Sequence, residues 1–192
     1  MRMIHMKVVH VNAEAQRNAC LARLCAEVYG QQAGLTPLVV FTGTCSVLFP
    51  QEAARLFAAV DGQGKPQALA LLVLDEEGEG MTVTHACALD QTDAQQRLIS
   101  ELTLKAPLRV EVDNAEREAF YQKSGIKRWF GGVDGKRIGL GARHPAKSIR
   151  ELAPTLVLDE ALILRRFKHD PKAFETAKQA FLKGLNDFPQ SL

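Results

Sequence analysis

Three side chains in the middle of the sequence carry acid–base chemistry that a reaction could use. Tyr121 has a phenol with an ordinary pKa near 10, which can protonate a departing group within hydrogen-bond reach. His85 and Glu111 are the candidates for a general base. A histidine on a half-apolar stretch is more often a packing residue, so the role of His85 stays open. Cys87 is a weaker candidate for a nucleophile, because nothing near it in sequence would lower the pKa of its thiol.

Residues 108–126 contain signals for a strand, a helix and a helix end in one continuous frame. Val110 and Val112 alternate with charged residues, which predicts a strand with one buried face. Asn114 can cap a helix that follows, and Gly125 can adopt the left-handed conformation that ends it. The segment therefore positions Tyr121 on a short helix directly after a strand.

This order resembles the fifth strand and fourth helix of the GNAT superfamily of N-acetyltransferases. Members carry an asparagine, a tyrosine seven residues on, and then a glycine followed by an aromatic residue; Asn114, Tyr121, Gly125 and Ile126 hold these places here. Arg117 replaces the usual alanine and Ile126 the usual phenylalanine, and neither change breaks the frame. The resemblance implies an acyltransferase that moves an acetyl or other acyl group from CoA to an amine by direct attack.

The same resemblance suggests roles for two of these residues. Tyr121 would protonate the departing CoA thiolate, although it could equally be a core residue of its helix. Asn114 would lie near the pantetheine arm of the cofactor, although helix capping alone explains its presence. The acceptor would be a small-molecule or peptide amine, whose identity the sequence does not indicate.

In the resembled family the pantetheine arm of acetyl-CoA pairs with the backbone of the fourth strand, which would be residues 81–89 here. Strand alternation predicts one face formed by Val83, His85, Cys87 and Leu89. The small side chains on the opposite face would let a cofactor approach the backbone, but they would also suit a crowded sheet. We therefore expect cofactor contacts from Ala86, Cys87, Ala88 and Leu89.

The segment after this strand departs from the resembled family, which places a glycine-rich loop there to hold the CoA pyrophosphate. This chain has Asp90 and Asp93 instead, with no glycine from 81 to 124. Because these carboxylates would repel phosphates, we expect acetyl-CoA to bind weakly or not at all. The side chains that could replace the missing donors are Gln95, Gln96 and Arg97. The alternative function is an inactive module of the same fold that binds another ligand or a protein.

Apolar patterns and turn formers outline the remaining elements. Residues 6–11 predict a strand, followed by a helix over 13–30 with Asn12 as its cap. Residues 38–41 and 46–49 are apolar runs that fit either strands or buried loop. The clearer elements are a meander of strands over 55–60, 67–74 and 81–89, a helix over 94–104, and a hairpin of 126–133 with 136–140 around Asp134-Gly135.

The predicted fold class is α/β, more narrowly α+β: a mixed, mostly antiparallel sheet with splayed central strands flanked by helices. Residues 1–141 would form this GNAT-like domain, and 142–192 a C-terminal helical extension. Ser148 and Glu151 have the spacing of a capping box, and Asp170-Pro171 predicts the start of another helix. The run 156–164 fits either a strand or a buried helix. The apolar stripe of the last helix would pack on the domain, at the substrate end of the cleft or in a homodimer; it consists of Ala173, Phe174, Ala177, Phe181 and Leu185.

Composition excludes several classes of protein. The 24 basic and 22 acidic residues give a net charge of +2, too balanced for a nucleic-acid surface, which usually shows a concentrated basic patch. No run approaches the ~20 apolar residues of a membrane span and no signal-type apolar core occurs near the start, so we expect a cytoplasmic protein. The four cysteines form no C-x-x-C pair, which argues against a zinc site or a disulfide framework.

Overall fold

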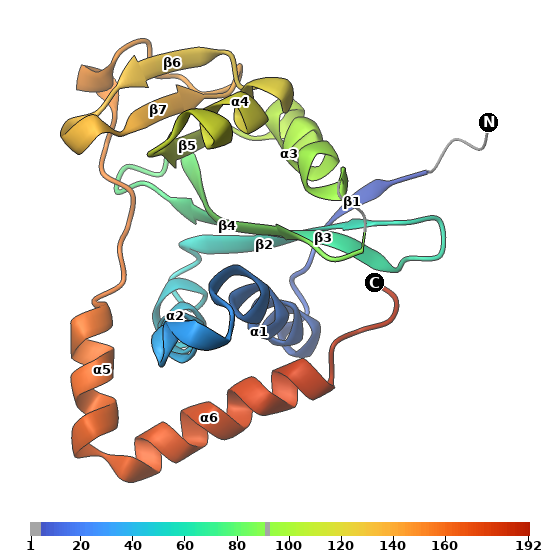
Figure 1. Cartoon of the computed structure of the whole chain (residues 1–192), viewed down its shortest axis with the longest axis vertical. Coiled ribbons are helices and arrows are strands. Elements are labelled where there is room, and N and C mark those ends of the chain that lie inside the picture. The colour runs from blue at the N-terminus through green and yellow to red at the C-terminus, as the bar shows by residue number, and fades with distance from the viewer. Residues whose placement is uncertain (1–4, 91–92) are drawn as a thin grey trace.

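The computed structural model describes residues 5–90 and 93–192, which fold around a single seven-stranded sheet (Figure 1). The strands are β1 (Lys7–His10), β2 (Ala54–Val60), β3 (Pro66–Leu74), β4 (Met81–Ala88), β5 (Leu108–Val112), β6 (Arg128–Gly131) and β7 (Arg137–Leu140). Their order is β1-β2-β3-β4-β5-β7-β6, and every neighbouring pair is antiparallel except the parallel pair of β4 and β5. The predicted fold class is confirmed.

Helices cover both faces of this sheet. The longer ones are α1 (Glu14–Tyr29), α2 (Thr36–Gly43), α3 (Ala94–Lys105), α4 (Ala115–Lys123), α5 (Glu160–His169) and α6 (Pro171–Asn186). One core lies between the sheet and α1 with α2, and includes Leu21, Leu24 and Leu56. A second core lies on the other side, where Leu98 and Ile99 of α3 pack on the strands. The sheet thus separates two apolar layers, with α1 and α2 on one side of it and α3 on the other in Figure 1.

Most of the predicted elements have the expected positions. The meander, the helix after it, the strand at 108–112 and the final hairpin are all present. In the hairpin, Asp134 and Gly135 both have positive φ, of 58° and 76°, which matches the tight turn that this dipeptide predicts. Local turn chemistry and strand alternation were sufficient for these elements, because both act over a few neighbouring residues.

Two expectations for the N-terminal half are wrong. Residues 38–41 lie in α2, and 46–49 lie largely in a π-helical turn (η2, Thr44–Leu48), so neither run is strand or loop. Helix α2 contacts α1, α5 and α6, as expected for a buried helix that is apolar on all sides. Such a helix has no amphipathic period, so the sequence pattern could not reveal it. Asn12 does not cap α1, because Ala13 occupies the N-cap position and makes no side-chain hydrogen bond there.

The C-terminal extension is only partly helical. The predicted helix at Ser148 is a single 3-10 turn (η4, Ile149–Glu151) without a side-chain cap. The chain then runs extended past Thr155, which bridges to Asp75, and α5 begins at Glu160. The run 156–164 is therefore extended in its first part and helical in its second. A domain boundary at 141/142 stays a prediction.

The last helix packs on its own chain, which is one of the placements that its apolar stripe left open. Phe181 meets Phe41 of α2 edge to face, with ring centroids 5.3 Å apart. Gly184 faces α1 so closely that an added Cβ would lie 2.9 Å from the Cβ of Ala22. The predicted cap of this helix is confirmed, because an Asp170 carboxylate oxygen accepts the backbone N–H of Ala173 at 3.0 Å. The extension therefore completes the core on the α1 side.

Candidate active site

The parallel strands β4 and β5 separate after two residue pairs. Met81 pairs with Leu108 and Thr82 with Arg109, and no further pairing of these strands occurs in the described residues. Strand β4 nevertheless stays paired with β3 as far as Ala88. Over residues 83–88, β4 thus has β3 on one side and, within the described part of the chain, no backbone partner on the other. The predicted splay of the central strands is confirmed.

A β-bulge in β4 changes which residues face each core. Leu71 pairs with His85 while Leu72 pairs with Val83, so Thr84 is an extra residue without a partner on β3. As a result Val83 packs in the core beside α3, whereas Cys87 packs in the core beside α1. The expectation that Val83 shares a face with His85 and Cys87 is wrong, because simple alternation fails at the bulge.

The bulge directs His85 toward the end of α1. Its Nε2 lies 2.7 Å from the phenol oxygen of Tyr29, and its Nδ1 lies 2.9 Å from the hydroxyl of Thr84. Burial lowers the pKa of His85 to about 4, and burial likewise raises the pKa of Tyr29 to about 12, with smaller contributions from Cys25 and Glu160. Both side chains are therefore uncharged at neutral pH.

Two tautomers of His85 fit these contacts. In one of them Nδ1 donates to the Thr84 hydroxyl, which itself donates to the carbonyl of Leu71 at 3.4 Å, and Nε2 accepts from the Tyr29 hydroxyl. Sequence reasoning identified His85 but missed Tyr29, because no local pattern relates two residues 56 positions apart.

Helix α4 holds Tyr121 as the motif predicted. Asn114 Oδ1 accepts the backbone N–H of Arg117 at 2.8 Å, so Asn114 is a helix cap. The helix ends at Lys123, Gly125 follows its C-cap with a φ of 103°, and the N–H of Ile126 returns to the carbonyl of Tyr121 at 3.0 Å. The Tyr121 side chain is only 4% exposed and packs in the core with α3.

Electrostatics and packing keep Tyr121 neutral. Burial raises the pKa of its phenol, and the Arg117 guanidinium one turn earlier opposes that shift in part.

The Gln96 side chain donates to the carbonyl of Lys123 at 3.2 Å, which fastens the first turn of α3 to the last turn of α4. The helices on this side of the splayed strands are thus tied together.

Comparison with solved structures identifies this arrangement. The aminoglycoside 6′-acetyltransferase type Ii superposes with a TM-score of 0.51 at 13% identity, over 74% of this chain and 99% of that chain. An acetyltransferase from Thermus thermophilus superposes with a TM-score of 0.52 at 16% identity, over 72% and 97%. The chain has the GNAT acyl-CoA N-acyltransferase fold.

Other comparisons add little at the level of sequence. The spermidine N-acetyltransferase from Vibrio cholerae, solved with CoA and spermine, gives a TM-score of 0.44 at 13% identity, over 72% of this chain and 97% of that one. No protein-family model and no curated protein matches the chain by sequence. At such identities the resemblance establishes the GNAT fold, and the activity must be argued from the chain's own residues.

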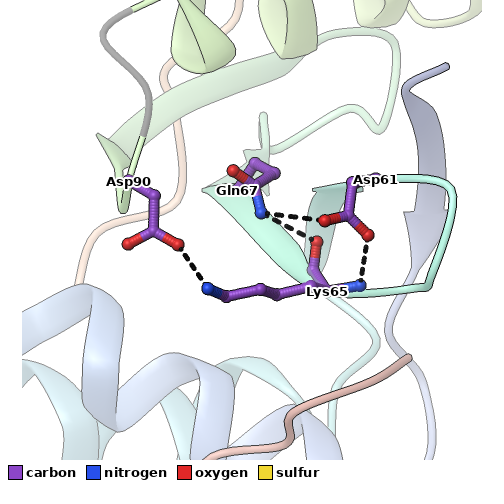
Figure 2. Close-up of polar contacts among 4 residues, drawn as sticks. All are labelled: Asp61, Lys65, Gln67 and Asp90. Atoms are coloured by element: carbon purple, nitrogen blue, oxygen red, sulfur yellow. Dashed lines mark hydrogen bonds and ion pairs between the residues drawn. The ribbon is translucent and has the colours of Figure 1, made fainter. Parts of the chain in front are cut away.

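A lysine that sequence reasoning missed lies beside the segment that follows β4. Lys65, at the turn between β2 and β3, places its Nζ 3.0 Å from an Asp90 carboxylate oxygen (Figure 2). Asp61 holds that turn by accepting the backbone N–H of Lys65 at 3.0 Å. Asp93 is balanced as well, since Arg97 lies 3.7 Å from it. The expected repulsion of phosphates by Asp90 and Asp93 is therefore partly neutralised; Gln91 and Thr92 lie outside the described residues.

The proposed cofactor donors at the start of α3 are not equally free. Gln96 is committed to the carbonyl of Lys123, and Arg97 to Asp93. Gln95 is half-buried and makes no side-chain hydrogen bond to any described residue. Ala86 and Ala88 of β4 and Leu89 just after it are half-buried at the splayed end of the strand. The cofactor-binding role of these residues stays a prediction; Ala86 and Ala88 lie on the part of β4 that has left β5, and Gln95, Gln96 and Arg97 lie in the first turn of α3.

Glu111 is engaged elsewhere. Its carboxylate accepts from Arg109 at 2.7 Å, and Arg109 also donates to the carbonyl of Ala153 in the C-terminal extension. Both charged residues line a cavity of about 370 Å³ beside the β6–β7 turn, whereas His85 contacts Tyr29 of α1. This environment makes Glu111 the weaker candidate for the base, because its charge is already paired.

The described residues give no support for a nucleophilic thiol, a metal site or a membrane-spanning helix. Burial raises the pKa of Cys87 to about 12, so its thiol stays protonated near neutral pH. All four cysteines are free, and residues 5–90 and 93–192 contain no group of three or more metal-ligating side chains. Within these same ranges, none of the helices combines the length and apolar character that crossing a lipid bilayer requires.

Proposed function

We propose that this protein transfers an acyl group from CoA to an amine, either a small molecule or a peptide. The free edge of β4 past Thr82 carries the proposal. Backbone N–H and C=O groups inside a fold require partners, and an extended ligand with amide groups can supply them as an added strand. The pantetheine arm of acetyl-CoA or another acyl-CoA is such a ligand, and the small side chains of Ala86 and Ala88 suit its close approach.

The residues at the other end of the cleft fit the rest of CoA less completely. Lys65 and Arg97 are the cations beside the segment that would meet the phosphates, but each is paired with an aspartate. Gln95 and Gln96 offer amide donors at the start of α3, and Asn114 lies at the start of α4. We therefore expect acyl-CoA to bind, but more weakly than it would to a loop rich in free backbone donors.

The Tyr29–His85 pair would act on the acceptor side of β4. Acyl-CoA supplies a thioester carbonyl, which an amine attacks once it has lost a proton. The Tyr29 oxygen can accept that proton while its own passes to Nε2 of His85, along the 2.7 Å contact. Because burial disfavours the charged imidazole, the proton must leave quickly to solvent, so the pair works as a relay rather than as a proton store.

Tyr121 would serve on the leaving-group side. Its raised pKa keeps the phenol protonated at neutral pH, so it can donate to the departing sulfur. Backbone N–H groups along the free edge of β4 would polarise the carbonyl oxygen during attack. A cytoplasmic location would suit the four free cysteines, and the C-terminal helices would be the contact surface of a homodimer.

A second candidate function is a non-catalytic module with the GNAT fold. The observation in its favour is that Tyr121 is 4% exposed and that Gln96 ties α3 to α4. An acyl-CoA could reach the Tyr121 phenol only if these helices moved apart. A module that never opens this space would bind a different ligand or a protein.

One titration separates the two functions. Purified protein is titrated with acetyl-CoA in a calorimeter, and turnover is then followed with spermidine and with an aminoglycoside as trial amines. Binding together with thiol release that requires an amine supports acyl transfer. Absence of heat and of protection against thermal unfolding at millimolar acetyl-CoA would favour the non-catalytic module.

A further inference from the structure

A second cavity, of about 620 Å³, lies far from the splayed strands. It is bounded by α2 and its π-helical continuation on one side and by α5 and α6 on the other, and none of its lining residues belongs to β4, β5 or α4. Figure 1 shows α5 and α6 on the side of α1 and α2 that faces away from the sheet. The size falls within the roughly 300 to 1,000 Å³ of small-molecule sites.

The walls of this cavity are mainly apolar. Its floor is formed by Phe41 of α2 and by Ile163 and Phe167 of α5. Apart from Lys172, the side chains that α6 contributes are small, which leaves the space open; they are Ala173, Thr176, Ala177 and Ala180. A ligand that fills this space must therefore have a substantial hydrocarbon part.

The opposite wall comes from the π-helical turn after α2. The N–H of Phe49 donates to the carbonyl of Thr44 at 2.9 Å, five residues earlier, and the widened turn places Cys45, Ser46 and Val47 on the cavity. Single π-helical turns within longer helical segments occur frequently at functional sites. Val47 is 40% exposed and Leu162 is 55% exposed, so apolar surface continues outward from the cavity.

The charged residues that line this cavity are two cations and one anion. Arg166 and Lys172 line it, and neither forms an ion pair with any residue in 5–90 or 93–192. Asp170 lines it too, but one of its carboxylate oxygens accepts the N–H of Ala173 as the cap of α6. Two unpaired cations beside an apolar cavity are complementary to a molecule with an alkyl chain and one anionic end.

We propose that this cavity binds a free medium-chain carboxylate, with its alkyl chain against Phe41 and Phe167 and its carboxylate between Arg166 and Lys172. The site is independent of the acyl-transfer cleft and does not rest on the function proposed for it. Its walls come from the C-terminal extension together with α2, so binding would stabilise the docking of α5 and α6 on the rest of the chain.

The probe for this site is sodium decanoate, used below its micelle concentration and measured by calorimetry on the full chain. Ala180→Trp fills the cavity from an exposed position on α6, so the variant should fold, and it should abolish binding. Arg166→Gln and Lys172→Gln should each weaken binding by about fivefold, the upper range for one partly exposed ion pair. Arg165→Gln, which removes a neighbouring charge outside the cavity, is the matched control and should change nothing.

Decylammonium, which has the same chain and the opposite charge, should bind at least tenfold more weakly. Equal binding of decylammonium, or decanoate binding that survives Ala180→Trp, would overturn the proposal. So would the absence of decanoate binding in a wild-type protein that sediments as a dimer and becomes a monomer with Ala180→Trp, because the cavity would then be an interface between two copies.

Discussion

The phenol oxygen of Tyr29, the last residue of α1, lies 2.7 Å from Nε2 of His85 in the middle of β4. This single contact joins the helical layer to the strand that borders the cleft. The two rings are also tilted against each other, with centroids 5.5 Å apart, so the pair is held by packing as well as by a hydrogen bond.

The Tyr29–His85 hydrogen bond should show as a coupling in stability. We expect Tyr29→Phe and His85→Phe each to lower the free energy of unfolding by about 1 kcal/mol or more, since each leaves a buried polar group without its partner. The double variant should be less destabilised than the sum of the two by about 1 kcal/mol. Urea unfolding of the four proteins measures this, and strict additivity would show that the contact contributes nothing.

The acid sensitivity of the fold should depend on His85. Its folded-state pKa of about 4 lies below the ordinary value of 6.5, so the unfolded chain takes up a proton first as the pH falls. The stability tied to neutral His85 is present above pH 6.5 and is lost as the pH falls from there toward 4, by on the order of 2 to 3 kcal/mol. Urea midpoints measured between pH 7 and pH 4.5 should therefore drop less in His85→Gln than in the wild type.

Other histidines provide the control for that measurement. Burial also lowers the pKa of His144, so His144→Gln should flatten the same pH profile to some degree. His169 is exposed at the end of α5, and His169→Gln controls for the loss of a surface histidine. A wild-type curve that His85→Gln reproduces at every pH would mean that His85 titrates normally.

The ion pair of Lys65 with Asp90 should limit acetyl-CoA affinity. Asp90→Asn removes a negative charge and frees Lys65 for a phosphate, so we expect binding to tighten by about fivefold, as for one exposed ion pair. In the background of Lys65→Gln the same change should have a much smaller effect. Calorimetry with acetyl-CoA measures the four proteins, and an identical response to Asp90→Asn in both backgrounds would contradict a role for Lys65.

Tyr121→Phe separates binding from turnover. The phenol donates to the leaving sulfur only as the thioester breaks, so its loss should reduce kcat by roughly a hundredfold or more while leaving the affinity for acetyl-CoA unchanged. Initial rates and calorimetry on the same preparation measure both quantities. Phe120→Leu on the same helix is a control for packing, because Phe120 meets Tyr121 edge to face. A Tyr121→Phe protein with undiminished kcat would exclude the phenol as the acid.

The close contact of Gly184 with α1 makes the docking of α6 testable. A larger side chain would press on Ala22, so Gly184→Val should lower the free energy of unfolding by roughly 1 to 3 kcal/mol. Lys178→Val introduces valine at an exposed position of the same helix, and it should cost only about 0.5 kcal/mol, because valine has a weaker helix propensity than lysine. Equal stability of the two variants would indicate that α6 does not rest on α1.

The parts of the fold that could be predicted from sequence depend on short-range signals. The cap at Asn114 and the left-handed residue at Gly125 lie at the two ends of the same short helix. The Asp134-Gly135 turn connects the two strands of its hairpin and is sufficient to predict it. Helix α2 could not be recognised, because its residues are apolar on every side and give no helical period. Ser148 has a capping spacing, but only one 3-10 turn follows it.

The candidate site was less predictable, because its contacts join distant segments. Tyr121 and His85 could be selected by residue type, but the partner of His85 comes from α1 and the partner of Asp90 from the β2–β3 turn. Neither partner has a sequence pattern of its own. Tyr29 ends a helix and Lys65 lies in a turn, and both are ordinary residues at such positions.

The bulge at Thr84 has a consequence for sequence alignment and for redesign. Because Thr84 is the unpaired residue, deletion of Thr84 alone would make Val83 and His85 consecutive, so Val83 could stay paired with Leu72 and His85 with Leu71. His85 and Cys87 would then still face α1. An ungapped alignment of this strand with a regular strand would instead assign Ala86 and Ala88 to the α1 side, so a gap placed at Thr84 decides which residues are read as facing each core.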